Sequence, residues 1–323
     1  MNILVNGNLK NSMTKKIETI DALIFIDTNI LLDFYRIRKS DISMKYLEQI
    51  ENHLELIITS SQVEMEFKKN RQSVILESIA EIKKIGTVTG KVPAILSDKK
   101  TVDMIAKSRK DIQKRQKKLK VKIEQILKSP VYNDPVYKSL QKMFRHKCDI
   151  NLNRENKKRI TIRNLAKKRF ILGYPPRKKS DNSIGDAVNW EWLIHCAKES
   201  GKHIILVTRD SDFGCLYDGE SYLNDWLQQE FKQRVSRKRK IILTDKLSRA
   251  FQLVEIPVTE EMIQEEKKVI KESLKNFMNY QIPNHFIEFS NELNNSDWMH
   301  SIRRFQELSK GFGINNEDDI ELE

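Results

Sequence analysis

The chain has 323 residues, of which 39% are hydrophobic and 32% are charged, and its formal net charge is +13. It contains no run of about 18 apolar residues, which excludes a membrane-spanning helix, and its first residues lack the pattern of a signal peptide, which predicts a cytoplasmic protein. The three cysteines form an odd set without a CxxC spacing, which argues against a disulfide framework or a zinc site.

The positive charge is unevenly distributed. The residues from Thr259 onward contain 7 Lys and Arg against 14 Asp and Glu, so the first 258 residues carry a net charge of +20. Basic residues gather at 107–122, 154–179 and 232–249. Any one of these clusters can be a solvated helix face, but three of them indicate a nucleic-acid partner that is bound mainly through its phosphates.

Hydrophobic periodicity, caps and turn residues predict a series of strands and helices. In chain order these are strand 22–26, helix 30–38, a helix from Ser40, strand 54–59, a long helix opened by a capping box of Ser61 and Glu64, a basic helical insertion at about 76–170 broken at Pro130 and Pro135, helix 184–200 ended by Gly201, strand 203–208 and strand 240–244. The alternation of strands and helices predicts an α/β fold with a doubly wound parallel sheet. We expect one domain over 18–258 and an acidic helical region over 259–323.

Carboxylates follow two of the buried strands. Asp27 ends the first strand, and Asp210 and Asp212 follow strand 203–208. Open α/β sheets bind ligands at the carboxyl ends of their strands, which is where these three side chains fall. Taken alone, Asp27 is also a normal helix N-cap, and Asp210 and Asp212 are normal turn residues.

Asp186 shares a helix face with Trp190, Leu193 and Ala197. It can cap the helix together with Ser183, but a carboxylate on an apolar stripe is costly to bury unless it is paired or binds a metal.

A second acidic candidate lies on the helix that begins near Ser61. Helical periodicity does not choose between Glu64 and Glu66, and Glu66 is the freer of the two because the capping box already occupies Glu64.

Several carboxylates in one place repel one another, and a divalent cation removes that repulsion. Oxygen ligands suit Mg²⁺ or Mn²⁺, which can activate water and stabilise the leaving oxygen in phosphodiester cleavage. The basic surface supplies the matching substrate, a nucleic-acid backbone.

Four segments in order, FIDTNILLDFYR, SSQVEMEFKKNR, IGDAVNWEWLI and IILVTRDSDFG, resemble the acidic motifs of the PIN-domain nucleases, especially a bacterial PIN-like group with a helical insertion. The resemblance implies Mg²⁺- or Mn²⁺-dependent endonucleolytic cleavage, commonly of RNA, by metal-activated water. The implied metal ligands and catalytic residues are Asp27, Glu66, Asp186 and Asp210, with Asp212 as an alternate or fifth ligand and with Asn29 and Thr208 in support.

We assign nucleic-acid contacts to the loop that leads to Asp186 and to two further arginines. These residues are Tyr174, Arg177, Lys178, Lys179, Arg71 and Arg209. RNA is the preferred partner. An inhibitory or defence-system protein and a second copy of the chain are further possible partners.

The leading hypothesis is an endoribonuclease, with a toxin or defence effector as one role, and a DNA endonuclease is its nearest rival. A phosphatase of the haloacid dehalogenase type needs a second aspartate at the position of Asn29, so the sequence argues against it. A non-catalytic nucleic-acid-binding protein would leave the placement of Asp186 unexplained.

Overall fold

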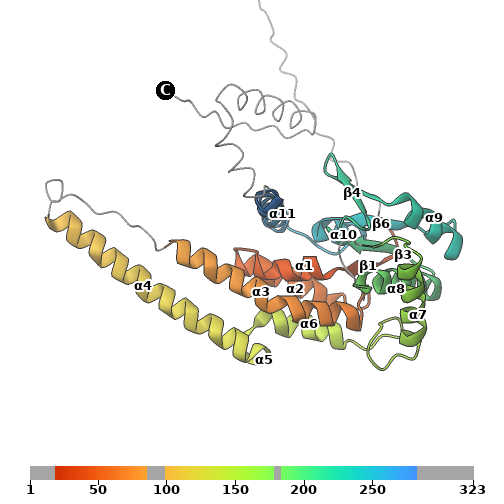
Figure 1. Cartoon of the computed structure of the whole chain (residues 1–323), viewed down its shortest axis with the longest axis horizontal. Helices are drawn as coiled ribbons and strands as arrows, with labels where there is room; N and C mark the ends of the chain where they lie inside the picture. The colour runs from red at the N-terminus through yellow and green to blue at the C-terminus, as the bar shows by residue number, and fades with distance from the viewer. Residues whose placement is uncertain (1–18, 86–98, 178–182, 282–323) are drawn as a thin grey trace, which may run out of the picture.

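The computed structural model describes residues 19–85, 99–177 and 183–281 (Figure 1). Its centre is a four-stranded parallel sheet in the order β2-β1-β3-β6, which confirms the predicted α/β fold. The strands are β1 (Ala22–Ile26), β2 (Ile57–Ile58), β3 (His203–Val207) and β6 (Ile241–Thr244). After β1 the chain adds β2 on one side of it and then adds β3 and β6 on the other side. The direction in which strands are added thus reverses between β1 and β3, and this position is the topological switch point of the sheet.

The strands form because unbroken apolar runs can be buried on both faces of a parallel sheet. All five residues of β1 are buried, and β1 pairs with β3 from Ala22 opposite His203 to Ile26 opposite Val207. The second strand is shorter than the predicted 54–59, since residues 53–56 form a turn before β2 begins.

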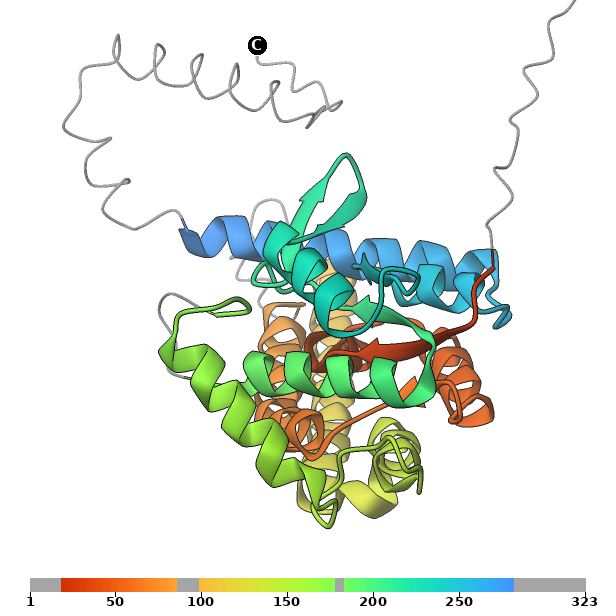
Figure 2. The same ribbon diagram turned by 90° about the vertical axis from the view of Figure 1, so that its right-hand side faces the viewer.

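Helices cover the sheet on both sides, and Figure 2 shows α11 (blue) above the strands and α8 (green) below them. The helices outside the insertion are α1 (Thr28–Leu32), the 3₁₀ helix η1 (Asp33–Tyr35), α2 (Ser40–Asn52), α3 (Ser61–Ile85), α8 (Gly185–Ser200), α9 (Asp225–Arg234), α10 (Leu247–Leu253) and α11 (Glu260–Gln281). The predicted helix 30–38 begins earlier and ends earlier, because Asp27 caps α1 and the chain tightens into η1. As predicted, Gly201 ends α8, in the left-handed conformation at φ 64°.

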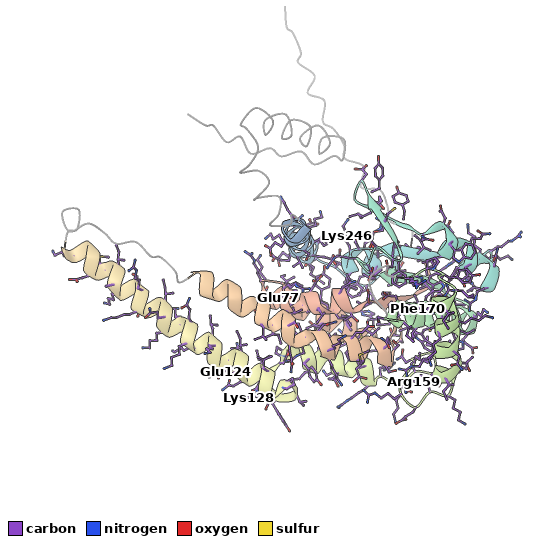
Figure 3. All side chains as sticks on the ribbon, viewed as in Figure 1. Glu77, Glu124, Lys128, Arg159, Phe170 and Lys246 are labelled. Atoms are coloured by element: carbon purple, nitrogen blue, oxygen red, sulfur yellow. The ribbon has the colours of Figure 1, made fainter. Side chains whose placement is uncertain are left out.

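The described part of the insertion is largely helical, as predicted, and residues 86–98 lie outside the described residues. It contains α4 (Lys99–Lys128), α5 (Pro130–Asn133), α6 (Pro135–Arg145) and α7 (Lys158–Ile171). Pro130 and Pro135 stand in the first turns of α5 and α6, where the missing N–H of proline costs no hydrogen bond. Figures 1 and 3 show α4 extending away from the sheet, with Glu124 and Lys128 toward its attached end.

A β-hairpin follows β3 and was not predicted. It consists of β4 (Gly214–Tyr217) and β5 (Glu220–Leu223), which pair in antiparallel fashion. Most of its side chains are exposed, so the sequence lacks the buried apolar run that marks the central strands.

The predicted boundary at residue 258 falls between α10 and α11. Beyond that point α11 packs against the body, where Met262 and Val269 are buried. The buried carboxylate of Glu266 accepts hydrogen bonds from the backbone N–H groups of Leu247 (2.5 Å) and Ser248 (3.1 Å) at the start of α10. Within the described ranges, no helix combines the length and the hydropathy needed to cross a membrane.

Candidate metal site at the carboxyl edge of the sheet

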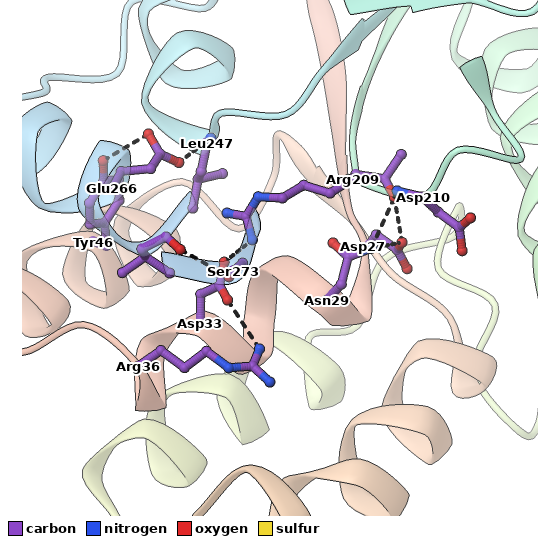
Figure 4. A network of polar contacts seen from close by, with 12 residues as sticks. Asp27, Asn29, Asp33, Arg36, Tyr46, Arg209, Asp210, Leu247, Glu266 and Ser273 are labelled. Carbon is purple, nitrogen blue, oxygen red and sulfur yellow. Dashed lines mark hydrogen bonds and ion pairs between the residues drawn. The ribbon is translucent and has the colours of Figure 1, made fainter. Parts of the chain in front are cut away.

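Asp27 lies directly after β1 and caps α1, so the cap that the sequence offered as an alternative is present. Its Oδ1 accepts a hydrogen bond from the N–H of Thr28 (2.7 Å). Its Oδ2 accepts hydrogen bonds from Thr208 Oγ1 (2.6 Å) and Asn29 Nδ2 (2.8 Å). The carboxylate is therefore held in one orientation by three neutral donors (Figure 4).

Thr208, directly after β3, joins the ends of the two central strands. Its hydroxyl donates to Asp27 and accepts hydrogen bonds from Asn29 Nδ2 (3.1 Å) and from the N–H of Asp210 (3.0 Å). A hydroxyl offers one donor and two acceptor positions, so this one is fully used. The supporting role that the resemblance implies for Asn29 and Thr208 therefore has a concrete form, because together they orient Asp27 and the loop of Asp210.

Three aspartates form a cluster beside these strand ends. One carboxylate oxygen from each of Asp186, Asp210 and Asp212 lies within 4.8 Å of the others, and all three residues are half-buried. Asp186 is in the first turn of α8, whereas Asp210 and Asp212 belong to the loop after β3, where the N–H of Asp212 donates to Asp210 Oδ1 (3.1 Å). The fold thus brings Asp186 together with two aspartates that lie 24 and 26 positions further along the sequence.

Glu66, on the second turn of α3, faces this region. Its Oε2 accepts a hydrogen bond from Thr28 Oγ1 (3.2 Å), and its Oε1 accepts one from Gln62 Nε2 (2.7 Å). Glu64 instead forms an ion pair with Lys68 (2.6 Å). Between the two alternatives, the structure therefore places Glu66 next to the start of α1 and Glu64 in a surface ion pair.

The predicted capping box at the start of α3 is not formed. Ser60, one residue earlier than expected, accepts the hydrogen bond from the N–H of Val63 (3.2 Å), and the N–H of Ser61 donates to the carbonyl of Leu152 (2.8 Å). Ser60 and Ser61 are equally suitable as N-caps in the sequence. In the structure the backbone N–H of Ser61 is used in the contact with the distant Leu152, and Ser60 is the residue that caps the helix.

Gly185, the first residue of α8, brings Glu66 close to Asp186. A Cβ atom at position 185 would lie 2.2 Å from Glu66 Oε1 and 2.9 Å from Gln62 Nε2. Only a residue without a side chain allows the carboxylate of α3 to approach the backbone at the start of α8 so closely.

The electrostatics of the site show in the pKa of Asp27. The pKa of its carboxyl is raised from 3.8 to about 6; burial is the largest cause, the negative charges of Glu66 and Asp210 add to it, and the hydrogen bonds from Thr208 and Thr28 act against it. Glu66 and Asp210 are therefore each close enough to Asp27 to repel its carboxylate. A group of hard oxygen donors under mutual repulsion fits a divalent cation, and Asp186, Asp210 and Asp212 can hold one.

The two arginines that we assigned to nucleic acid lie in ion pairs within the protein. Arg71 is buried, its Nε lies 2.9 Å from Asp134 Oδ2, and it donates to the hydroxyl of Tyr35 (3.0 Å). Arg71 therefore joins α3 to the residue that caps α6.

Arg209 forms an ion pair with the buried Asp33 of η1, which also contacts Arg36 (3.2 Å) (Figure 4). Because Arg209 precedes Asp210, this pair links the loop that carries Asp210 and Asp212 to η1, which follows Asp27 and α1. Asp33, which the sequence left without a role, is thus part of the support of the site.

The loop before α8 is described in part. Tyr174 is 41% exposed, and Arg177 is exposed with its guanidinium 4.8 Å from the ring centre of Phe170. Lys178 and Lys179 lie outside the described residues, so their assignment to nucleic acid stays a prediction.

Thr28, Gly185 and Asp33 were not identified from the sequence as parts of the site. Gly185 offered a signal, since a glycine immediately before the acidic residue of a helix start indicates a close approach. Asp33 offered none, because an aspartate near a helix end is usually exposed.

The profile of one protein family, described as a PIN domain, matches residues 24–213 of the chain. The matched region contains Asp27, Glu66, Asp186, Asp210 and Asp212, and it bears out the resemblance seen in the four acidic segments. Comparisons with curated proteins and with solved structures gave no match.

Proposed function

This chain belongs to the PIN-domain family, and from that premise we propose that it is a metal-dependent endoribonuclease. PIN domains are typically metal-dependent nucleases, and the aspartate cluster of this chain can hold a metal ion. The observation that carries the proposal is the convergence of carboxylates from four separate segments at the switch point of the sheet. A structural protein has no need to gather repelling charges there.

Each residue of the site has a role in this proposal. Asp186, Asp210 and Asp212 would hold Mg²⁺ or Mn²⁺, with Asp27 and Glu66 beside them. A bound divalent cation supplies the Lewis acidity that activates the attacking water and stabilises the leaving oxygen. Thr208 and Asn29 keep Asp27 oriented, so that its carboxylate needs little rearrangement when a substrate phosphate arrives.

RNA is the proposed substrate, since the body of the chain is strongly basic and the family commonly cleaves RNA. The lysines of α4 support this assignment, because side chains between Asp103 and Lys122 are almost all exposed and available to phosphates. DNA is the alternative substrate of the same site, and the assay must include it.

We further propose a cytoplasmic toxin or defence effector whose activity a protein partner restrains. Free thiols at Cys148, Cys196 and Cys215 fit a reducing compartment. A nuclease acting on cellular RNA needs control, and the partner or a second copy of the chain would supply it.

The test is cleavage of total RNA and of single- and double-stranded DNA by purified protein with Mn²⁺, Mg²⁺ or EDTA. We expect RNA cleavage with either metal and none with EDTA. Asp186→Asn should lower the rate on the order of 10³-fold, because metal-based stabilisation of the transition state is worth several kcal/mol.

Asp103→Asn is the matched control, because it makes the same change of charge on the exposed surface of α4 and should retain full activity. Intact RNA and DNA after incubation with wild type and Mn²⁺ would overturn the proposal. Cleavage of DNA but not of RNA would show that DNA is the substrate of this site.

A further inference from the structure

Two half-exposed aromatic side chains stack on each other at the surface. The ring centres of Tyr174 and Trp226 lie 5.4 Å apart, with 26° between the ring planes. Tyr174 is 41% exposed and Trp226 is 49% exposed. Large aromatic side chains gain most from burial, so a stacked pair left open to solvent offers a flat apolar face on which a ligand can pack.

The pair joins the two segments that flank the aspartate cluster. Tyr174 lies in the loop that leads to Asp186, and Trp226 is the second residue of α9, which follows Asp212 after the β4–β5 hairpin. The backbone N–H of Asn224, the N-cap of α9, donates to the carbonyl of Phe213 (2.9 Å), the residue after Asp212, so α9 starts next to the loop that follows β3 at the carboxyl edge of the sheet.

The position of α9 relative to α8 follows from one contact. Trp190 Nε1 of α8 donates a hydrogen bond to Glu230 Oε2 of α9 (3.0 Å). Trp190 and Glu230 each lie four residues, about one helical turn, after Asp186 and Trp226. The two helices therefore begin side by side at the same edge. Trp226 lies at the start of α9, next to the start of α8, which carries Asp186.

The end of α7 carries exposed basic side chains and lies next to Tyr174, whose backbone N–H donates to the carbonyl of Arg169 (3.1 Å). Lys167 and Lys168 of α7 and Arg177 of the following loop are exposed, and the guanidinium of Arg177 is held over Phe170, which is labelled in Figure 3. Phosphates and aromatic bases are what such a combination of basic side chains and open aromatic faces binds.

We propose that Tyr174 and Trp226 form a stacking platform for an unpaired base of single-stranded RNA whose backbone runs to the aspartate cluster. The inference rests on the proposed function and adds its substrate class. A base in a duplex is already stacked on its neighbours, whereas a base of a single strand can lie on a protein ring. The platform thus makes the nuclease selective for single strands without reading a particular base.

Binding is measured by fluorescence anisotropy at one fixed salt concentration, in an Asp186→Asn background that does not cut the probe. The probes are a labelled 12-nucleotide single-stranded RNA and its duplex. We expect Trp226→Ala to raise the Kd for the single strand about 5- to 150-fold, since stacking of one base on an aromatic side chain is worth about 1–3 kcal/mol. The Kd for the duplex should stay unchanged.

Two variants separate stacking from other roles of the pair. Trp226→Phe retains an aromatic face and should restore most of the affinity for the single strand. Tyr217→Ala removes a more exposed aromatic side chain, 73% exposed on the hairpin, and should leave binding unchanged. Thermal melts should show that all three variants are folded.

Unchanged single-strand affinity in Trp226→Ala would overturn the platform, and it is also the result expected if the rings served a protein partner. An equal loss for single strand and duplex would overturn it too, because the rings would then only hold the loop. Neither result bears on the proposed nuclease activity. That proposal is contradicted separately, if the wild-type protein with Mn²⁺ cleaves no nucleic acid.

Discussion

Two groups of buried carboxylates lie on or beside α8, and they differ in their partners. Glu191, in the middle of α8, lies between Arg169 (2.9 Å) and Arg234 (2.6 Å). Asp27, at the strand ends, receives hydrogen bonds from a hydroxyl, an amide and a backbone N–H. Burial alone raises the pKa of Glu191, but the hydrogen bonds and charges of Arg234 and Arg169 outweigh it and hold that pKa below its usual value.

The same burial has the opposite result at Asp27, where it is the largest cause of a pKa raised to about 6 and the negative charges of Glu66 and Asp210 add to the rise. A buried carboxylate is therefore not in itself a sign of function. A carboxylate that is neutralised by arginine joins helices α7, α8 and α9, whereas one that faces other carboxylates has a use for a cation.

The arginine-paired group should be the more costly to break. We expect Glu191→Ala to lower the free energy of unfolding by about 3 kcal/mol, because it removes one of the two carboxylates that the buried Arg169 and the half-buried Arg234 share and leaves only Glu230 to pair with both. Urea denaturation followed by circular dichroism measures the change. Glu199→Ala is the control, since Glu199 is about half exposed and its removal should cost less than 1 kcal/mol; equal effects would remove the distinction between the two sites.

The carboxylate-facing group should respond to pH and metal. Below pH 3.8 Asp27 is protonated in both the folded and the unfolded chain. Between about pH 4 and 6 the unfolded chain ionises first, so the metal-free folded protein should lose up to about 3 kcal/mol of stability as the pH rises.

Mn²⁺ binds the ionised site, so its stabilising effect should be small at pH 5 and full at pH 7.5. Thermal melts with and without Mn²⁺ at both pH values test this, and Asp27→Asn should weaken the pH dependence. Equal shifts at the two pH values would contradict the raised pKa of Asp27.

Gly185→Ala tests whether Glu66 belongs with the aspartates. The new Cβ would displace the Glu66 carboxylate, which now lies where the methyl group would stand, and we expect roughly tenfold weaker Mn²⁺ binding. Titration calorimetry measures the affinity. Glu66→Gln should weaken binding at least as much, and a normal affinity in both variants would remove Glu66 from the site.

The smallest effect should come from Glu64. Its ion pair with Lys68 is at the surface, so Glu64→Gln should change the free energy of unfolding by no more than about 0.5 kcal/mol and leave RNA cleavage within about twofold. The cleavage assay on Glu64→Gln and Glu66→Gln side by side decides between the two glutamates, and a greater loss in Glu64→Gln would reverse our assignment.

The strands and the aspartates could be predicted because each leaves a local pattern. Buried parallel strands are continuous apolar runs, and the ends of such strands point to the edge where Asp27 and Asp210 lie. Asp186 was found through the apolar stripe of its own helix. These signals lie within a few residues of one another, so one sequence is enough to read them.

The remaining features depend on contacts between distant segments. Arg71 and Arg209 carry the same charge as exposed arginines, and only their meeting with Asp134 and Asp33 turns them into internal ion pairs. The choice of Ser60 over Ser61 depends on Leu152, and the exposed hairpin β4–β5 has no apolar periodicity. Single-sequence patterns carry no information about partners 60 or more residues away.

The pairing of β3 with β6 sets the size of the smallest fragment that can fold. The family match ends at Phe213, but Ile204–Val207 of β3 pair with Ile241–Thr244 beyond it, and Glu266 fixes the start of α10. A fragment cut at the end of the match would expose one edge of its central sheet to other molecules and would tend to aggregate. Gene fragments for expression, or fusions to another protein, should therefore keep the chain through residue 281.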